Sequence, residues 1–176
     1  VKSENKKKIG ILGGTFDPPH KGHLYISKIG IKKLKLNKLI WAITKKNPLK
    51  KKSYLNLNLR INLAKKITNK EKKIDVRYYE NKIKSMSTYK LLKYIKKNNS
   101  KTKLFFLMGA DNLIKFHKWN RWEKISNLVK IVIFPRKNFS VKSNKIIALK
   151  KLDKKDLINI KSKKINISSS LIRKFW

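Results

Sequence analysis

The chain has 176 residues, which is the size of one domain and enough to bury a core, so we expect a single domain over residues 1–176. Cysteine is absent, which excludes disulfides and thiol catalysis, and no apolar stretch is long enough to span a membrane, so we expect a soluble cytoplasmic protein without a membrane partner. The formal net charge of +39 is typical of a nucleic-acid-binding module. However, only five of the 48 basic residues are arginine, and the lysines are spread along almost every segment. This distribution favours a solvated lysine surface and no specific nucleic-acid partner.

The first predicted element is a strand at Ile9–Leu12, a short apolar run of the kind that is buried on both faces of a sheet. Gly13 and Gly14 end this strand, and because they lack side chains an anion can approach their backbone amides closely. A glycine turn after a buried strand indicates a nucleotide-binding corner. Its spacing is neither that of a P-loop nor that of a dinucleotide-binding fingerprint.

The second predicted element is a helix that begins at about His20, because the proline pair before it opposes helix formation. His20 and His23 would share one face of its first turn, where unpaired amides and the helix dipole favour negative charge. Gly22 between them would let a flat or bulky ligand lie against the helix backbone. We expect no protein-bound metal, because the chain offers only one further histidine and no cysteine.

The alternation of strands and amphipathic helices continues along the chain. Apolar runs predict four further strands, at residues 39–44, 74–79, 103–108 and 131–134. Helical spacing predicts helices between them, among them one with Leu59, Leu63, Ala64 and Ile67 on its apolar face. We therefore expect an α/β protein with a Rossmann-like, doubly wound parallel sheet of about five strands and helices on both faces. Residues 141–164 are rich in lysine and predict little beyond a short apolar run at residues 146–149.

The stretch Gly-Gly-Thr-Phe-Asp-Pro-Pro-His-Lys-Gly-His at residues 13–23 resembles the His-x-Gly-His signature of the nucleotidylyltransferase superfamily. It is similar to the nicotinate-nucleotide adenylyltransferase family in particular. The resemblance implies that the amides around Thr15 and Phe16 and the side chains of His20 and His23 hold the reacting phosphates.

Later segments extend the resemblance. Gly109 and Asp111 after the fourth strand match the family's Gly-x-Asp, where Asp111 can accept hydrogen bonds from ribose hydroxyls or cap the next helix. The family also implies a role near the ATP nucleotide for Arg136. It implies mononucleotide contacts for Lys46, for Ser87, and for Trp119 through stacking on the pyridine ring. The alternative role of Ser87 is that of a helix N-cap, and the residue before it, Met86, stands where relatives carry tyrosine.

The closing motif is Ile-Ser-Ser-Ser-Leu-Ile-Arg at residues 167–173. Serines before an apolar pair indicate a helix start, whose hydroxyls and amides can cap the helix or bind phosphate, and Arg173 lies one turn after Ser170. The motif resembles the family's binding site for the ATP phosphates, to which Ser168, Ser169, Ser170 and Arg173 would then belong.

The resemblance implies that His20, His23 and Arg173 catalyse adenylyl transfer from ATP to nicotinate mononucleotide, with Mg²⁺ carried on the ATP phosphates. Pantetheine-phosphate adenylyltransferases share both motifs, but they usually have threonine in place of His20 and lack the Trp119 segment. The sequence leaves the choice between nicotinate and nicotinamide mononucleotide open.

Overall fold

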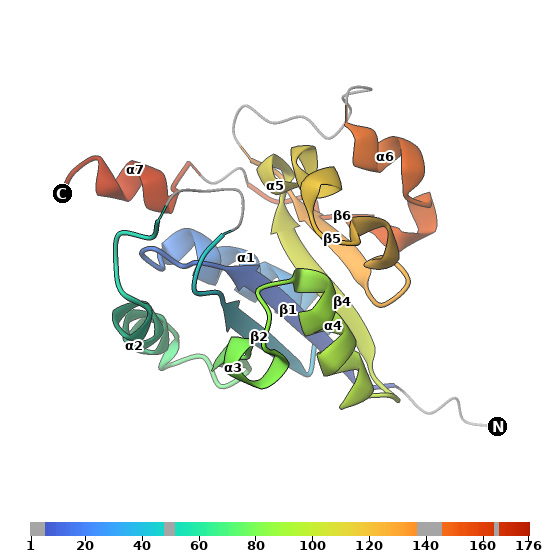
Figure 1. The fold of residues 1–176 in the computed structure, drawn as a ribbon, viewed down its shortest axis with the longest axis horizontal. Helices are drawn as coiled ribbons and strands as arrows, with labels where there is room; N and C mark the ends of the chain where they lie inside the picture. The colour runs from blue at the N-terminus through green and yellow to red at the C-terminus, as the bar shows by residue number, and fades with distance from the viewer. Residues whose placement is uncertain (1–5, 48–51, 137–145, 164–165) are drawn as a thin grey trace.

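A fully parallel sheet forms the centre of the protein, which a computed structural model describes over residues 6–47, 52–136, 146–163 and 166–176. Within these ranges the sheet has six strands in the order β3-β2-β1-β4-β5-β6 (Figure 1). The strands are β1 (Lys8–Gly14), β2 (Lys38–Ile43), β3 (Ile74–Tyr78), β4 (Lys103–Gly109), β5 (Lys130–Phe134) and β6 (Leu157–Asn159). Since the chain winds outward in both directions from β1, the order reverses between β1 and β4, and such a switch point is where doubly wound sheets bind ligands.

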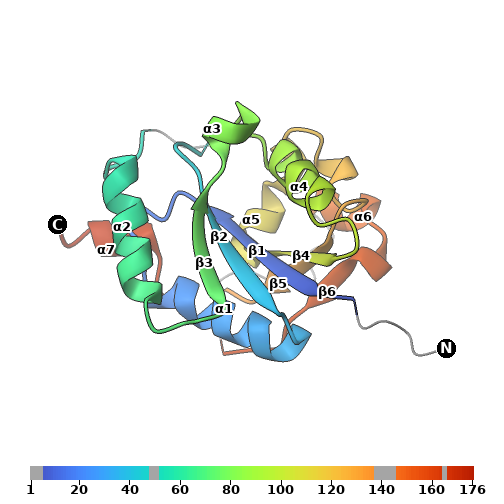
Figure 2. The same cartoon turned by 90° about the horizontal axis from the view of Figure 1, so that it is seen from below.

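Helices cover both faces of the sheet. Among the described residues they are α1 (Lys21–Leu34), α2 (Leu57–Thr68), α3 (Glu80–Ile83), α4 (Thr88–Lys97), α5 (Ala110–Ile114), α6 (Ile147–Lys151) and α7 (Ser169–Arg173), with 3₁₀ turns at Phe116–Lys118, Trp122–Lys124 and Lys154–Asp156. Figure 2 shows α1 and α4 on opposite sides of the sheet. None of these described helices is long and apolar enough to cross a membrane.

Two hydrophobic layers result from the alternation of side chains along the strands. On β4, Phe105 and Leu107 point into a layer that α1 and α2 cover, whereas Phe106 and Met108 point into the layer under α4, α5 and α6. Both layers consist of buried side chains with partly buried ones packed against them, so the edge of the sheet between them is well supported.

The predicted fold class is confirmed, and two details of it are wrong. β6 is a sixth strand within the lysine-rich segment, where three residues pair with β5 without any sequence periodicity. On α2 the buried positions are Arg60, Ala64 and Thr68, whereas Leu59 is 41% exposed, so the buried stripe is displaced from the predicted one.

Candidate active site

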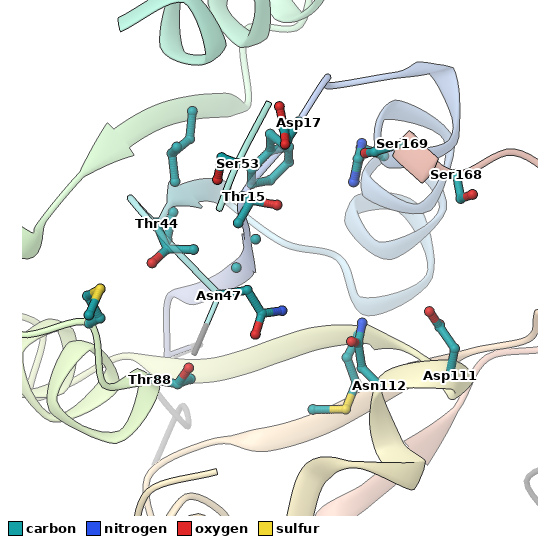
Figure 3. Close-up of a pocket in the computed structure, with 18 of the residues that line it drawn as sticks. Thr15, Asp17, Thr44, Asn47, Ser53, Thr88, Asp111, Asn112, Ser168 and Ser169 are labelled. Atoms are coloured by element: carbon teal, nitrogen blue, oxygen red, sulfur yellow. The ribbon is translucent and has the colours of Figure 1, made fainter. Parts of the chain in front are cut away.

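A large cavity opens at the carboxyl ends of β1, β2 and β4, next to the switch point. Its volume is about 1280 Å³, somewhat more than the roughly 300–1,000 Å³ of a typical small-molecule pocket, so two nucleotides have room in it. In Figure 3, Thr15, Asp111 and Ser169 face this space from the loop after β1, the start of α5 and the start of α7. Segments more than 150 residues apart in the sequence therefore meet at one site.

Most of the predicted site residues line this cavity. They are Gly13, Gly14, Thr15, Phe16, His20, His23, Ser87, Asp111, Trp119, Arg136, Ser168, Ser169, Ser170 and Arg173. Gly22, Gly109 and Lys46 do not line it. Lys46 has an exposed side chain outside the cavity, and its contact with the mononucleotide stays a prediction.

The two glycines outside the cavity serve the packing around it. At Gly22 a Cβ atom would lie 2.7 Å from Cγ2 of Ile167 and 2.8 Å from Nδ1 of His20, so the close approach of the chain favours glycine there, and its role toward a ligand stays a prediction. At Gly109 a Cβ atom would collide with Oδ1 of Asp111. Both glycines thereby fix the position of a neighbouring site residue.

The two histidines cap α1 with their own rings. His20 is the N-cap, one residue before the helix, and its Nδ1 accepts a hydrogen bond from the Gly22 amide at 3.1 Å. His23 Nδ1 accepts from the His20 amide at 3.2 Å, and the two rings stack with centroids 3.8 Å apart. Because each Nδ1 accepts a backbone N–H, each neutral ring carries its proton on Nε2.

Both rings are neutral near pH 7. Burial, and secondarily the charge of Arg136, lower the pKa of His20 to about 4. Burial, then His20 and Arg136, hold the pKa of His23 well below its ordinary value. In the unliganded protein these histidines are therefore neutral hydrogen-bond donors, and their contact with the reacting phosphates stays a prediction.

The C-terminal motif is fastened to the loop after β1. Ser168 is the N-cap of α7 and accepts from the Leu171 amide at 3.1 Å, while the Ser169 hydroxyl donates to the Pro18 carbonyl at 2.8 Å. Arg173 donates to the Asp17 carbonyl and, at 3.2 Å, to the Ser170 hydroxyl. The hydroxyl of Ser168 therefore caps α7 and that of Ser169 joins the motif to Pro18, while Arg173 lines the same cavity as His20 and His23.

A second arginine joins the strands on the other side of the switch point. Arg136 Nε lies 3.2 Å from Asp111 Oδ1, and its Nη1 donates to the Ile167 carbonyl at 2.7 Å. Asp111 belongs to the first turn of α5, whose N-cap is Gly109, so the alternative of helix capping by Asp111 is wrong. The pair links the ends of β4 and β5 to the C-terminal motif.

The remaining predicted residues form the wall of the cavity near α4. Trp119 is partly buried and packs edge-on against Phe106 and Phe116, at centroid distances of 6.0 and 5.2 Å. Ser87 is the N-cap of α4, as one of its two predicted roles required, and its hydroxyl also donates to Asn120 Oδ1 at 3.2 Å. Trp119 therefore combines a core contact with a face toward the cavity.

Sequence analysis missed Arg60, whose side chain is only 1% exposed. Its guanidinium donates to four backbone carbonyls, those of Leu55 (3.1 Å), Thr15 (2.6 Å), Thr44 (2.8 Å) and Lys45 (2.9 Å). It thereby joins the loops after β1 and β2 to the start of α2. The available signal was chemical: arginine is rare in this chain, and here it interrupts the apolar positions of a helix.

Asp17 is a second residue that sequence analysis missed. It is 4% exposed, and its carboxylate accepts from the amides of Tyr54 (2.8 Å) and Leu55 (2.9 Å). Its Oδ2 lies 3.8 Å from Nη1 of Arg173, whose guanidinium also lies over the Tyr54 ring at 4.5 Å. Asp17 therefore holds together three segments of the cavity wall.

The cavity wall is predominantly cationic. Its basic residues are Lys52, Lys90, Lys118, Arg136, Arg173 and Lys174, and its carboxylates are Asp17, Glu80 and Asp111. Each of these carboxylates already accepts a hydrogen bond or pairs with an arginine. Such a wall attracts polyanionic ligands such as nucleotides.

Comparison with known proteins agrees with this site. The cytidylyltransferase-like family matches residues 11–175. A protein of Pelagibacter ubique named "Probable nicotinate-nucleotide adenylyltransferase" is 49% identical over 179 residues, which cover 99% of both chains. One of Clostridium tetani with the same name is 35% identical and covers 95% of this chain and 86% of its own.

Solved structures show the same fold. The nicotinic acid mononucleotide adenylyltransferase of Plasmodium falciparum, solved in complexes with NaAD and with APC, is 27% identical to this chain and superposes with a TM-score of 0.77. The match covers 96% of this chain and 83% of that one. The chain belongs to the cytidylyltransferase-like family and, within it, to the nicotinate-nucleotide adenylyltransferases.

Proposed function

We propose that this protein transfers the adenylyl group of ATP to nicotinate mononucleotide, which yields deamido-NAD and pyrophosphate. The observation that carries the proposal is the assembly of the histidine pair, Arg173 and Trp119 around one cationic cavity with room for two nucleotides. The named relatives and the two nucleotide complexes of the Plasmodium enzyme support it. A cytoplasmic location is part of the proposal, because ATP is a substrate.

The reaction requires no nucleophilic side chain. An oxygen of the mononucleotide 5′-phosphate forms a bond to the α-phosphorus of ATP, and the bond from that phosphorus to the bridging β-oxygen breaks and releases pyrophosphate. Catalysis of such a transfer depends on positioning and on stabilising the charge that develops on phosphate oxygens. Neutral donors with fixed tautomers suit this task, since they offer N–H groups without moving a proton.

We assign roles to the site residues on this basis. His20 and His23 donate their Nε2–H groups to α-phosphate oxygens, together with the amides of Gly14 to Phe16. Arg173 holds the departing pyrophosphate, Trp119 stacks on the pyridine ring, and Asp111 accepts from a ribose hydroxyl.

We also propose that Mg²⁺ enters on the ATP phosphates. Among the described residues no group of three or more His, Cys, Asp or Glu side chains could hold a metal ion, so these residues supply no carboxylate cage for it. Bound on the triphosphate, the ion would neutralise part of its charge, and the roles assigned to the protein residues do not depend on it.

The decisive experiment measures pyrophosphate release from ATP with three acceptors in parallel. Nicotinate mononucleotide should give the highest kcat/KM, above nicotinamide mononucleotide and 4′-phosphopantetheine. A preference for phosphopantetheine would refute the proposal, whereas equal use of the two mononucleotides would confirm the reaction and correct the acceptor.

A further inference from the structure

Four aromatic rings form a column that runs from the core of the protein into the cavity. Trp41, which is fully buried on β2, stacks on Phe16 with centroids 4.8 Å apart and planes 19° apart. Phe16 contacts the His23 ring at 4.7 Å, and His23 stacks on His20 at 3.8 Å. The indole of Trp41 therefore supports the histidine rings through Phe16, and it also contacts the His23 ring edge-on with centroids 5.9 Å apart.

The backbone of His23 is tied to the same indole by hydrogen bonds. Trp41 Nε1–H donates to the Ser27 hydroxyl at 2.8 Å, and that hydroxyl donates to the His23 carbonyl at 2.7 Å. Ser27 is fully buried, so water does not compete for either bond. The ring and the backbone of His23 are thus both attached to Trp41, a rigid residue of the sheet.

This double attachment has a consequence for the reaction. Misplacing a reacting group by about 1 Å can cost on the order of 100-fold in rate, so an N–H donor needs a support that allows little movement. In His23 the capping bond from the His20 amide fixes the ring rotation, and the bonded Ser27 hydroxyl fixes the helix turn that carries the ring.

We propose that Ser27 and Trp41 are positioning residues that hold the His23 donor in place for adenylyl transfer. The inference rests on the proposed function for the identity of the reaction, but the attachment itself can be measured without activity. Neither residue lines the cavity, so neither touches a substrate.

The chain contains a matched control. Thr68 on α2 is also buried, and its hydroxyl donates at 2.8 Å to the carbonyl of Ala64, four residues earlier, as Ser27 does to His23. Thr68 does not line the cavity. Thr68→Val and Ser27→Ala therefore remove the same kind of helix bond at different distances from the site. Ser27→Ala in addition leaves the buried Trp41 N–H without its acceptor, so Thr68→Val controls for the loss of the helix bond alone.

The experiment compares Ser27→Ala, Thr68→Val and Trp41→Phe with the unaltered protein, well below their Tm values. In Ser27→Ala, kcat should fall about tenfold with both KM values within about twofold, because the donor is loosened while the phosphate-binding cations are untouched. Trp41→Phe keeps a ring against Phe16 and loses the indole N–H, so it should reproduce part of this loss. Thr68→Val should keep its kcat. Unchanged kcat in Ser27→Ala, or an equal fall in Thr68→Val, would overturn the inference.

A second measurement separates this inference from the proposed function. Nitrogen-15 spectra of the histidine rings near pH 7 should show His23 as the Nε2–H tautomer in the unaltered protein and in Thr68→Val, and shifted toward a mixture in Ser27→Ala. Unaltered His23 signals in Ser27→Ala would overturn the positioning role whether or not the protein transfers adenylyl groups. If the unaltered protein lacks that activity, the proposed function fails and these spectra still decide the attachment.

Discussion

Replacement of Arg60 by methionine tests whether one buried side chain holds together the loops after β1 and β2 and the start of α2. Its guanidinium donates four hydrogen bonds to carbonyls of three different segments and is 1% exposed. A hydrogen bond to a charged group contributes about 1.5–3 kcal/mol, and a buried acceptor without a partner costs about 1–3 kcal/mol. Relaxation of the loops would recover part of this sum, so we expect a loss of about 3–5 kcal/mol in the free energy of unfolding.

For a chain of this size a loss of 1 kcal/mol lowers Tm by about 2–4 °C, so Arg60→Met should lower it by roughly 6–20 °C. Arg77→Met is the control, because Arg77 has a 58% exposed side chain, is paired with Asp75 on β3 and should cost about 1 kcal/mol or less. Thermal unfolding followed by circular dichroism measures both variants. If the two Tm values fall equally, the carbonyls around Arg60 find other partners and its clamping role is refuted.

The remaining predictions concern the site itself. In the unfolded chain the His20 ring takes up a proton below about pH 6.5, whereas in the folded protein it does so only near its pKa of about 4. His20 alone should therefore lower the free energy of unfolding by about 2 kcal/mol between pH 7.5 and 5. Urea titrations of the unaltered protein and of His20→Asn, which keeps an N-cap, test this contribution. Trp119→Ala should raise KM for the mononucleotide about tenfold or more without changing KM for ATP. Trp122 lies outside the cavity, so Trp122→Ala should only lower Tm. Equal effects of Trp119→Ala on the KM values of both substrates would assign Trp119 to the core alone. Arg173→Ala should raise KM for ATP and lower kcat. His23→Ala should lower kcat roughly 100- to 1,000-fold with unchanged circular dichroism. Near-normal turnover of folded His23→Ala would refute the proposed mechanism.

The sequence predicts those parts of the fold that local patterns determine. Apolar runs such as residues 103–108 mark buried strands, and the glycine and proline punctuation around His20 places the start of α1 within one residue. β6 escapes prediction because three residues have no periodicity of their own and become a strand only by pairing with β5. The formation of β6 therefore depends on tertiary contacts.

Within the site, the sequence identifies the side chains that face the ligand better than those that hold them. His23 and Arg173 each belong to a sequence motif, whereas Arg60 and Ser27 have roles that appear only when distant carbonyls and an indole are brought to them. The packing role of Gly22 is hidden in the sequence for the same reason, because one of the side chains that a Cβ atom would meet there is Ile167, far along the chain.

The charge state of the histidines shows how the site divides its work. In a chain with a net charge of +39, a buried imidazole next to Arg136 is stabilised in its neutral form, so further positive charge at this point is unfavourable. Arginine remains charged in any such environment and is therefore suited to holding phosphate charge. His20 and His23, kept neutral and fixed by their own capping bonds, can instead donate N–H groups with a defined direction. Burial, and secondarily the charge of Arg136, thus suit His20 and His23 to the oriented hydrogen bonding proposed for them and leave the proposed binding of phosphate charge to the arginines.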